Sequence, residues 1–416
     1  MTPAGVGQRD NLPWQKKLYF LVILGCAALV ILECGARLTF YFKEGRNPYY
    51  LKFGFVADTE FHSYEGPGYT KFQPNTFMHQ QVNGQTISMK INSSGFRSLR
   101  DFIPPKDKTV FRITTLGSSS TFGYFVEDDQ TYPSQLERML QVSYPGKRIE
   151  VLNLGIPHAR MDDIVALARH ELAALKPNIV TLYEGANDAF WPKPRREAGK
   201  IYRLKDWLYF HSVLWRVVHS TVKYVYIFFA QTTSMDPIKL PHLGALQLTQ
   251  SQIERLREEI RRNFRVNLEK LHEITDELGA TLILITQNYS LKMLPGSGFE
   301  DKWRTYEEEL AILRDVQRKK RSLSPTQASF LIHSDLQNET KRFAKERSLG
   351  LVDGIAALKR DPSQMLSYVH LSPLGNQWIA KAIHDYLESQ KMFQVIPEEM
   401  AAGQKNMQPS RLFAVP

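Results

Sequence analysis

The residues of this chain that could perform chemistry together are a serine, an asparagine and a histidine, each in a short distinctive segment. Ser119 lies in the glycine-bounded run 117–123, Asn187 lies two residues after a glycine, and His370 stands in the last part of the chain. A serine hydroxyl becomes a nucleophile when a neighbouring imidazole takes its proton, and an amide side chain can donate a hydrogen bond to the resulting oxyanion. These residue types, in this order, predict a serine hydrolase.

The pattern around Ser119 predicts how the nucleophile is presented. A β-rich run over 111–116 precedes it and a helical pattern follows, so Ser119 would lie at a strand-to-helix turn with its hydroxyl pointing into a cleft. Strands and helices continue to alternate along the chain, which predicts a parallel sheet covered by helices on both faces. The predicted strands are 111–116, 149–154, 179–183, 281–286 and 349–352, and the predicted helices are 132–142, 162–175, 253–274, 302–319, 334–347 and 376–388.

Near the N-terminus, residues 18–32 form an apolar segment without a charge. As a helix this segment would rise about 22 Å, short of a hydrocarbon core of roughly 30 Å, but the span becomes adequate if Glu33 and Arg37 are included. These two residues are four apart, so they lie on one helical face and could pair. We therefore expect one uncleaved signal anchor, with a buried helix of the soluble domain as the alternative; the flanking positive charges do not decide its orientation.

Composition narrows the class of protein further. The 416 residues carry a formal charge of +10, and the basic residues are spread widely, which is typical of a solvated basic face; no nucleic-acid motif accompanies them. The only cysteines, Cys26 and Cys34, lie in the apolar segment. The remainder of the chain therefore has no cysteine for a disulfide or a thiolate metal site.

Changes of pattern along the chain predict its organisation. A second apolar stretch, 207–230, is interrupted by basic residues and histidines, so it is expected to pack on the domain or lie at the membrane surface. The expected segments are a polar tail (1–17), the transmembrane anchor (18–42), a β-containing lead-in (43–106), the main domain (107–390) with an insertion at about 190–248, and a C-terminal tail (391–416).

Taken together, the segments 117–123, 185–188 and 369–375 resemble the SGNH hydrolase superfamily, also called GDSL-type esterases and lipases, in a membrane-anchored bacterial arrangement. The resemblance covers roughly residues 109–387, and 92–97 looks like the lead-in of anchored members. It implies an α/β fold, a three-layer α/β/α sandwich with a parallel, flavodoxin-like sheet, preceded by one transmembrane helix. It also implies ester chemistry without a cofactor.

The resemblance assigns roles to individual residues. It implies that Ser119 is the nucleophile and that His370 is the general base, which takes the serine proton and then protonates the leaving alkoxide. The oxyanion hole would consist of the backbone N–H of Ser119, the side-chain amide of Asn187 and the backbone N–H of His158. No cluster supports His158 as a metal ligand, and Asp188 is expected to be structural.

Three positions depart from the family pattern. Ser118 replaces the aspartate of the Gly-Asp-Ser motif, a side chain that supports the turn in the family, and His158 stands where the family usually has an oxyanion-hole glycine. The carboxylate expected three residues before the base is replaced by Ser367. Three possibilities follow for the base: a backbone carbonyl orients it, Asp353 or Asp361 substitutes, or activity is low.

The expected function is hydrolysis of an ester, such as an O-acetylated glycan or a lipid, through a Ser119 acyl-enzyme. Two alternatives remain: acyl transfer to a sugar hydroxyl, and a catalytically weak domain that binds a glycan or a protein partner. The aromatic residues of 207–229 could form an acyl-binding wall or a membrane-facing lid. The anchor and the family together imply an extracytoplasmic catalytic domain, and the oligomeric state is left open.

Overall fold

The structure is a computed structural model that describes residues 13–44, 72, 74–82, 85–102, 106–189, 212–215, 218, 250–294, 297–319, 322–358 and 361–393. The chain divides into two compact units. One unit comprises residues 1–60 and 196–235, and the other comprises residues 61–195 and 236–416. The second unit contains every predicted site residue.

A five-stranded parallel sheet forms the centre of the second unit. Its strands are β3 (Val110–Gly117), β4 (Arg148–Gly155), β5 (Ile179–Tyr183), β6 (Thr281–Ile285) and β7 (Gly350–Val352), in the order β4-β3-β5-β6-β7. The chain moves from β3 to β4 on one side and then to β5 on the other, so the order reverses at β3. In open α/β sheets, ligands bind beside such a reversal, at the carboxyl ends of the strands.

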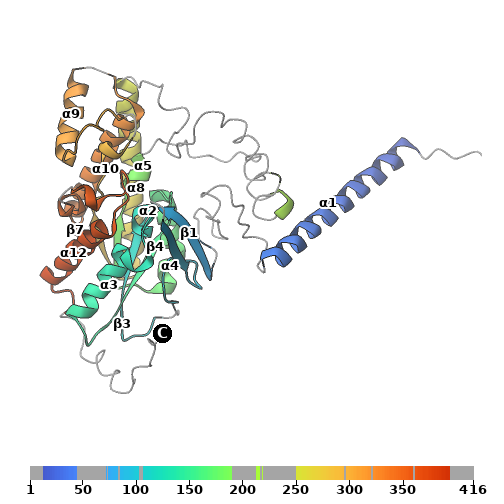
Figure 1. The fold of residues 1–416 in the computed structure, drawn as a ribbon, viewed down its shortest axis with the longest axis horizontal. Helices are drawn as coiled ribbons and strands as arrows, with labels where there is room; N and C mark the ends of the chain where they lie inside the picture. Colours follow the sequence, from blue (N-terminus) through green and yellow to red (C-terminus); the bar gives the residue numbers. More distant parts are fainter. Residues whose placement is uncertain are drawn as a thin grey trace, which may run out of the picture. The chain divides into compact units, whose positions relative to one another are not determined.

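Helices cover both faces of this sheet and complete the predicted α/β/α sandwich (Figure 1). On one face, α4 (Met161–Leu175), α8 (Gln250–Glu277) and α10 (Pro325–Glu346) share one apolar core, and on the other, α3 (Tyr132–Ser143) and α12 (Pro373–Ser389) share a second. Strands buried on both faces are mainly apolar, as in β6, although β3 and β4 also bury polar side chains such as Arg112 and Asn153. The shorter helices are α2 (Ser119–Phe122), η2 (Asp128–Gln130), α5 (Ala186–Ala189), η3 (Leu291–Met293), α9 (Tyr306–Arg318), α11 (Gly354–Ala357) and η4 (Pro362–Gln364).

Most predicted elements agree with the observed bounds to within about three residues, and α10 is the main exception. It begins at Pro325, nine residues before the predicted start at 334. Ser324 caps it by accepting a hydrogen bond from Gln327 N, while the Gln327 side chain returns the contact. The missed segment begins with the small or polar residues 325–329, and its apolar residues, Phe330, Leu331 and Ile332, are consecutive, so they show no helical spacing.

Two antiparallel strands precede the sheet within the predicted lead-in. They are β1 (Thr76–Val82) and β2 (Gln85–Ile91), which pair from Thr76 opposite Ile91 to Val82 opposite Gln85. Met89, Ile91 and Phe96 are buried in the same apolar core as α4 and α8. This pair of strands therefore packs as part of the α/β unit.

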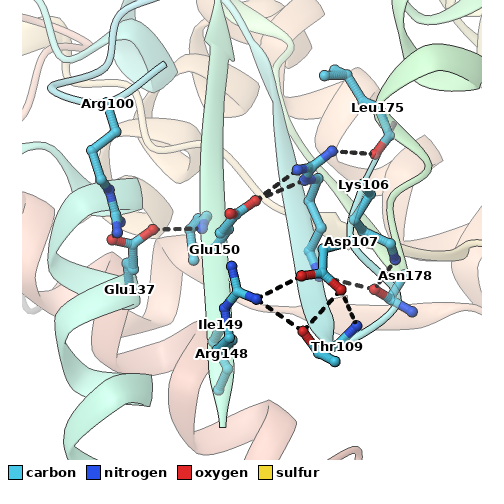
Figure 2. Close-up of polar contacts among 12 residues, drawn as sticks. Arg100, Lys106, Asp107, Thr109, Glu137, Arg148, Ile149, Glu150, Leu175 and Asn178 are labelled. Atoms are coloured by element: carbon cyan, nitrogen blue, oxygen red, sulfur yellow. Dashed lines mark hydrogen bonds and ion pairs between the residues drawn. The ribbon is translucent and has the colours of Figure 1, made fainter. Parts of the chain in front are cut away.

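A polar network fastens the strands near their amino ends (Figure 2). Arg112 on β3 is almost fully buried; it donates two hydrogen bonds to Glu150 on β4, at 2.8 and 2.9 Å, and one to the carbonyl of Leu175, at 2.6 Å. The side-chain oxygen of Asn178 accepts from Lys106 Nζ at 2.6 Å and from Arg112 N at 2.8 Å. Each of the three nitrogens of the buried guanidinium thus donates a hydrogen bond, and the opposite, carboxyl ends of the strands remain for the site.

In the first unit, α1 (Trp14–Glu44) contains the predicted anchor and extends it slightly at both ends. Within the described ranges it is the one helix long and apolar enough to cross a membrane, over Trp14–Thr39. Glu33 accepts from Arg37 Nε at 2.7 Å, as the spacing predicted, and also from the backbone N–H groups of Val213 and Leu214, each at 2.9 Å. Apart from 212–215 and 218, the insertion 190–248 and the apolar stretch 207–230 lie outside the described residues, as does the tail beyond 393.

Candidate active site

The nucleophile candidate Ser119 begins α2 directly after β3. Two glycines allow this short helix to lie close to the sheet. A Cβ at Gly117, whose φ is +157°, would lie 2.1 Å from Thr121 Oγ1, and one at Gly155 would lie 2.1 Å from Phe122 N. Because these separations are shorter than any real contact, the strand-to-helix turn requires glycine at both positions.

The structure brings Ser119 and His370 together although 251 residues separate them. Ser119 Oγ lies 2.8 Å from His370 Nε2. His370 stands in the loop between η4 and α12, and this loop is fixed to the nucleophile's own helix because Ser120 Oγ donates to the carbonyl of Val369 at 3.0 Å. The helix that carries Ser119 and the loop that carries His370 are therefore fixed to each other, as a nucleophile–base pair requires.

The other ring nitrogen of His370 contacts the residue that replaces the expected carboxylate. Ser367 Oγ lies 2.6 Å from His370 Nδ1 and also accepts the backbone N–H of His370 at 3.1 Å. Asp353 is instead bonded to Thr286 and Lys341, and Asp361 accepts from the N–H of Ser363. Of the three possibilities for the base, neither the backbone carbonyl nor Asp353 or Asp361 is in contact with Nδ1 here, where a serine hydroxyl occupies this place; the geometry does not test the third, low activity.

Aromatic side chains surround the His370 ring. Phe125 meets it edge-on, with ring centroids 4.9 Å apart and an interplanar angle of 89°, and Tyr124 and Tyr368 lie at 5.6 and 6.4 Å. Burial lowers the pKa of His370 to about 3, and the nearby His158 lowers it as well. The imidazole is therefore neutral at ordinary pH, the form that can accept a proton.

A buried arginine holds the loop that carries these rings. Arg97 is 2% exposed and donates to the carbonyls of Phe122 (3.0 Å), Gly123 (2.6 Å) and Val126 (2.6 Å), and to the carboxylate of Asp128 (2.7 Å). The sequence resemblance placed 92–97 in a lead-in but gave Arg97 no role. Residue type alone does not show that an arginine is buried, so the sequence carried no signal for this contact.

His158 lies at the third position of a tight turn. The N–H of Ala159 donates to the carbonyl of Ile156 at 3.0 Å, Pro157 follows Ile156, and the φ of His158 is +63°. A proline followed by a residue with positive φ is the pattern of a type II turn, whose third position favours glycine. The family's glycine is thus replaced by a histidine that keeps the glycine conformation, with its side chain exposed.

Asn187 on α5 connects the two predicted oxyanion elements. Its Nδ2 donates to the carbonyl of Ala159 at 2.9 Å, which leaves the second amide hydrogen for another acceptor. Gly117, Gly155 and Tyr183 are in register across β3, β4 and β5, so the loops with Ser119, His158 and Asn187 leave the same edge of the sheet. Asp188 accepts from the N–H of Met161 at the start of α4, a structural contact as expected.

The sequence analysis missed Glu184, which lies beneath this edge. It is 2% exposed, accepts from the N–H of Asn187 at 3.3 Å and forms hydrogen bonds with Ser118. Burial raises the pKa of Glu184 to about 7, although its hydrogen bonds lower it. Ser118 therefore supports the turn, as the resemblance implied, but by binding an acid from the neighbouring strand.

No group of three or more histidine, cysteine, aspartate or glutamate side chains among the described residues is placed to hold a metal ion. The site as described is built from hydroxyl, imidazole, amide and backbone groups. These are the groups of acyl-transfer chemistry through a serine nucleophile.

Comparison with known proteins gives one family match. A sequence model of the GDSL-like lipase/acylhydrolase family matches residues 115–378. A search of curated proteins found no match.

Several solved structures are similar to this chain at low identity. A lipase/acylhydrolase from Enterococcus faecalis is 18% identical, with 67% of this chain and 96% of that chain covered and a TM-score of 0.37. A catalytic mutant of an acetylxylan esterase from Geobacillus stearothermophilus is 18% identical, with 67% and 94% covered and a TM-score of 0.38. The esterase EstA from a Pseudoalteromonas species is 9% identical, with 68% and 98% covered and a TM-score of 0.37.

Proposed function

Since this chain belongs to the GDSL-like lipase/acylhydrolase family, the SGNH hydrolases, we propose that it hydrolyses a carboxylic ester through a covalent Ser119 acyl-enzyme. The observation that carries the proposal is the 2.8 Å contact between Ser119 Oγ and His370 Nε2 at the carboxyl edge of the sheet. Substrate carbonyl groups would bind at this edge, beside the reversal of strand order.

The proposed reaction follows from the arrangement of these groups. His370 Nε2 takes the proton of Ser119 as Oγ attacks the ester carbon, and the carbonyl oxygen becomes an oxyanion. The N–H groups of Ser119 and His158 and the Asn187 amide would donate to this oxygen. His370 returns the proton to the leaving alkoxide, and water then attacks the acyl-enzyme with His370 again as the base.

A second serine–histidine pair in the chain has the same separation at a different place in the fold. Ser143 Oγ lies 2.8 Å from His384 Nε2, the same separation as in the proposed site. Ser143 is the exposed last residue of α3, with no glycine-bounded turn before it. This pair is away from the carboxyl edge of the sheet, so it provides a matched control.

The proposal is tested by labelling the full-length protein, purified in detergent, with a fluorophosphonate probe. We expect the parent to be labelled, Ser119→Ala and His370→Ala to lose labelling, and Ser143→Ala and His384→Ala to keep it. A folded parent that stays unlabelled would contradict the hydrolase proposal and favour a binding domain. Labelling that persists in Ser119→Ala would contradict the assignment of the nucleophile.

The substrate proposed is an O-acetylated glycan or a lipid ester. Hydrolysis and transfer to a sugar hydroxyl share every step up to the acyl-enzyme and differ in the molecule that attacks it. Product analysis with an acetyl ester, with and without an added polyol, separates them. Free acetate in both reactions supports hydrolysis, whereas an acetylated polyol would show transfer.

We also propose that α1 anchors the protein as a single membrane span with the catalytic unit outside the cytoplasm. The support is the length and apolar character of Trp14–Thr39. Protease treatment of intact spheroplasts should then digest the catalytic unit. Protection of the unit until the cells are lysed would place it on the cytoplasmic side, and a mature protein lacking α1 would identify a cleaved signal.

A further inference from the structure

The strongest unexplained contact in the site is between Ser367 and His370. In serine hydrolases of this kind a carboxylate normally accepts a hydrogen bond from Nδ1–H, and this fixes both the orientation and the tautomer of the imidazole. In this chain the atom in contact with Nδ1 is the hydroxyl oxygen of Ser367, at 2.6 Å. A hydroxyl can either donate or accept, so it does not fix the tautomer by its chemistry alone.

We propose that Ser367 is the positioning residue of the reaction, which accepts the Nδ1–H hydrogen bond and holds His370 in the tautomer whose Nε2 can take the Ser119 proton. The inference rests on the proposed hydrolase function and adds to it a Ser119–His370–Ser367 relay without a carboxylate. Ser367 acts through His370 and does not touch the reacting atoms.

The hydrogen bonds of Ser367 favour this direction. Its oxygen has two lone pairs and one hydrogen. The backbone N–H of His370 donates to one lone pair at 3.1 Å, while the N–H of Val369 is at the 3.5 Å limit and competes weakly. The second lone pair is therefore available for Nδ1–H, and Nε2 is left without a hydrogen to face Ser119.

The reverse arrangement differs by a rotation of the Ser367 hydroxyl together with a tautomer change, in which the imidazole proton moves from Nδ1 to Nε2. If that hydroxyl donates to Nδ1, then Nε2 carries the hydrogen and cannot take a proton from Ser119. A carboxylate would exclude this inactive arrangement because it only accepts. Replacing the hydroxyl with a carboxylate should therefore increase the fraction of His370 in the competent tautomer.

The missing carboxylate also changes the charge around the His370 imidazole. The groups that face His370 are Tyr124 from the loop after α2, His158 from the loop after β4, Tyr368 from its own loop and Ser119 from α2. In the part of the chain that the structure describes, no carboxylate forms a hydrogen bond or ion pair with this imidazole. Glu184 acts on the pKa of Tyr368 rather than on His370.

The imidazolium formed during proton transfer thus gains no opposite charge, and its dipolar partner is the Ser367 hydroxyl. The resting imidazole stays neutral far into the acid range. We expect the rate of attack by Ser119 to show no fall between pH 8 and pH 5 from protonation of His370. A carboxylate at position 367 would raise the pKa of His370 and introduce such a fall.

The test measures the second-order rate of fluorophosphonate labelling of the full-length protein in detergent, from pH 5 to pH 8, for three variants at position 367. We expect Ser367→Ala to react about tenfold more slowly than the parent, and Ser367→Thr, which keeps the hydroxyl, to react within about threefold of it. Ser367→Asp should react at least about tenfold faster at pH 8 and lose rate as the pH falls.

The possible outcomes separate this inference from the proposed function. An unlabelled parent would overturn the function itself. A labelled parent with Ser367→Ala reacting at the parent rate would overturn only the role of Ser367. An aspartate variant with the parent rate and the parent pH profile would show that a carboxylate here does not control Nδ1. If that variant fails to fold, as judged by thermal unfolding, the alanine–threonine pair decides.

Discussion

Replacing Arg97 by methionine should destabilise the protein strongly and slow the chemistry at a distance. The methionine keeps an apolar stem beside Phe122, whose ring lies 5.1 Å from the guanidinium carbon, and removes only the donors. The carbonyls of Phe122, Gly123 and Val126 would then lose their hydrogen bonds from Arg97. Phe122 keeps a hydrogen bond from Asn153 Nδ2 and Gly123 keeps one from the N–H of Val126, each at 3.3 Å, so the Val126 carbonyl is the acceptor that loses its donor. Asp128 would lose its ion pair.

The expected loss of unfolding free energy follows from the buried acceptors that lose Arg97 as a donor in Arg97→Met. A buried acceptor without a donor costs about 1–3 kcal/mol, and removing one partner of a buried ion pair costs about 3–5 kcal/mol. Asp128 keeps a hydrogen bond from the N–H of Lys90, and water can reach part of the loop, so we expect a loss near about 4 kcal/mol. Such a loss is a large fraction of the typical stability of about 5–15 kcal/mol. Arg97→Lys should lose about half as much, because one ammonium group cannot reach three carbonyls and a carboxylate.

The matched control is Arg100→Met, which removes an arginine from the same loop. The Arg100 side chain is 61% exposed and pairs with Glu137, which keeps a hydrogen bond from the N–H of Val151 at 2.8 Å, so the loss of Arg100 should cost about 1 kcal/mol. Urea unfolding of the full-length protein gives the stabilities, and the fluorophosphonate rate reports the loop that carries Tyr124 and Phe125. The reasoning is refuted if Arg97→Met is no less stable than Arg100→Met, since water would then satisfy the Val126 carbonyl and the Asp128 carboxylate.

Two further predictions concern the buried Glu184 beneath the site and His158 in the tight turn. Burial raises the pKa of Glu184 from 4.5 to about 7, so between these pH values the folded protein keeps a proton that the unfolded chain releases. Protonated Glu184 therefore stabilises the folded protein fully below pH 4.5. This stabilisation, up to about 3 kcal/mol, is lost as the pH rises through 7. Urea unfolding between pH 5 and pH 8 should show this loss in the parent and not in Glu184→Gln; equal slopes would contradict it. His158→Gly should raise the unfolding free energy by about 0.5–1 kcal/mol by removing the left-handed strain at φ +63°, whereas His158→Val should lower it. A glycine variant less stable than the parent would show that the histidine side chain contributes more than the strain costs.

The sheet could be predicted from the sequence because its strands obey a simple rule. Strands covered on both faces are rich in apolar residues, and β5 was predicted at its observed bounds, Ile179–Tyr183. The start of α10 was missed because it opens with small and polar residues and its first large apolar residues, Phe330 to Ile332, are consecutive and give no helical period. Arg97 and Glu184 were missed for a different reason, since residue type does not show which charged side chains are buried.

The order of the three motifs in the sequence predicted which residues form the site, but not how the base is oriented. The positions of Ser119, Asn187 and His370 follow from strand ends and from the family resemblance. The sequence marked Ser367 only by the carboxylate that it lacks, and left open a backbone carbonyl, an aspartate elsewhere or low activity. The 367–370 turn determines which group contacts Nδ1. The N–H of Leu366 donates to the carbonyl of His370 at 2.8 Å, and the turn places Ser367 Oγ beside Nδ1.

A base without a carboxylate partner depends heavily on how firmly the rest of the site is held. Gln287, which follows β6, links the elements of the site through one side chain. Its Oε1 accepts from Ala186 N at 2.7 Å, and its Nε2 donates to Ser120 Oγ at 3.2 Å. Ser120 in turn donates to the carbonyl of Val369, next to the base. The helix of Asn187, the helix of Ser119 and the loop of His370 are thereby joined through one buried amide. Donors fixed in this way need no reorganisation when the oxyanion forms, so stabilisation of the oxyanion can offset what the neutral Ser367 does not supply to the imidazolium.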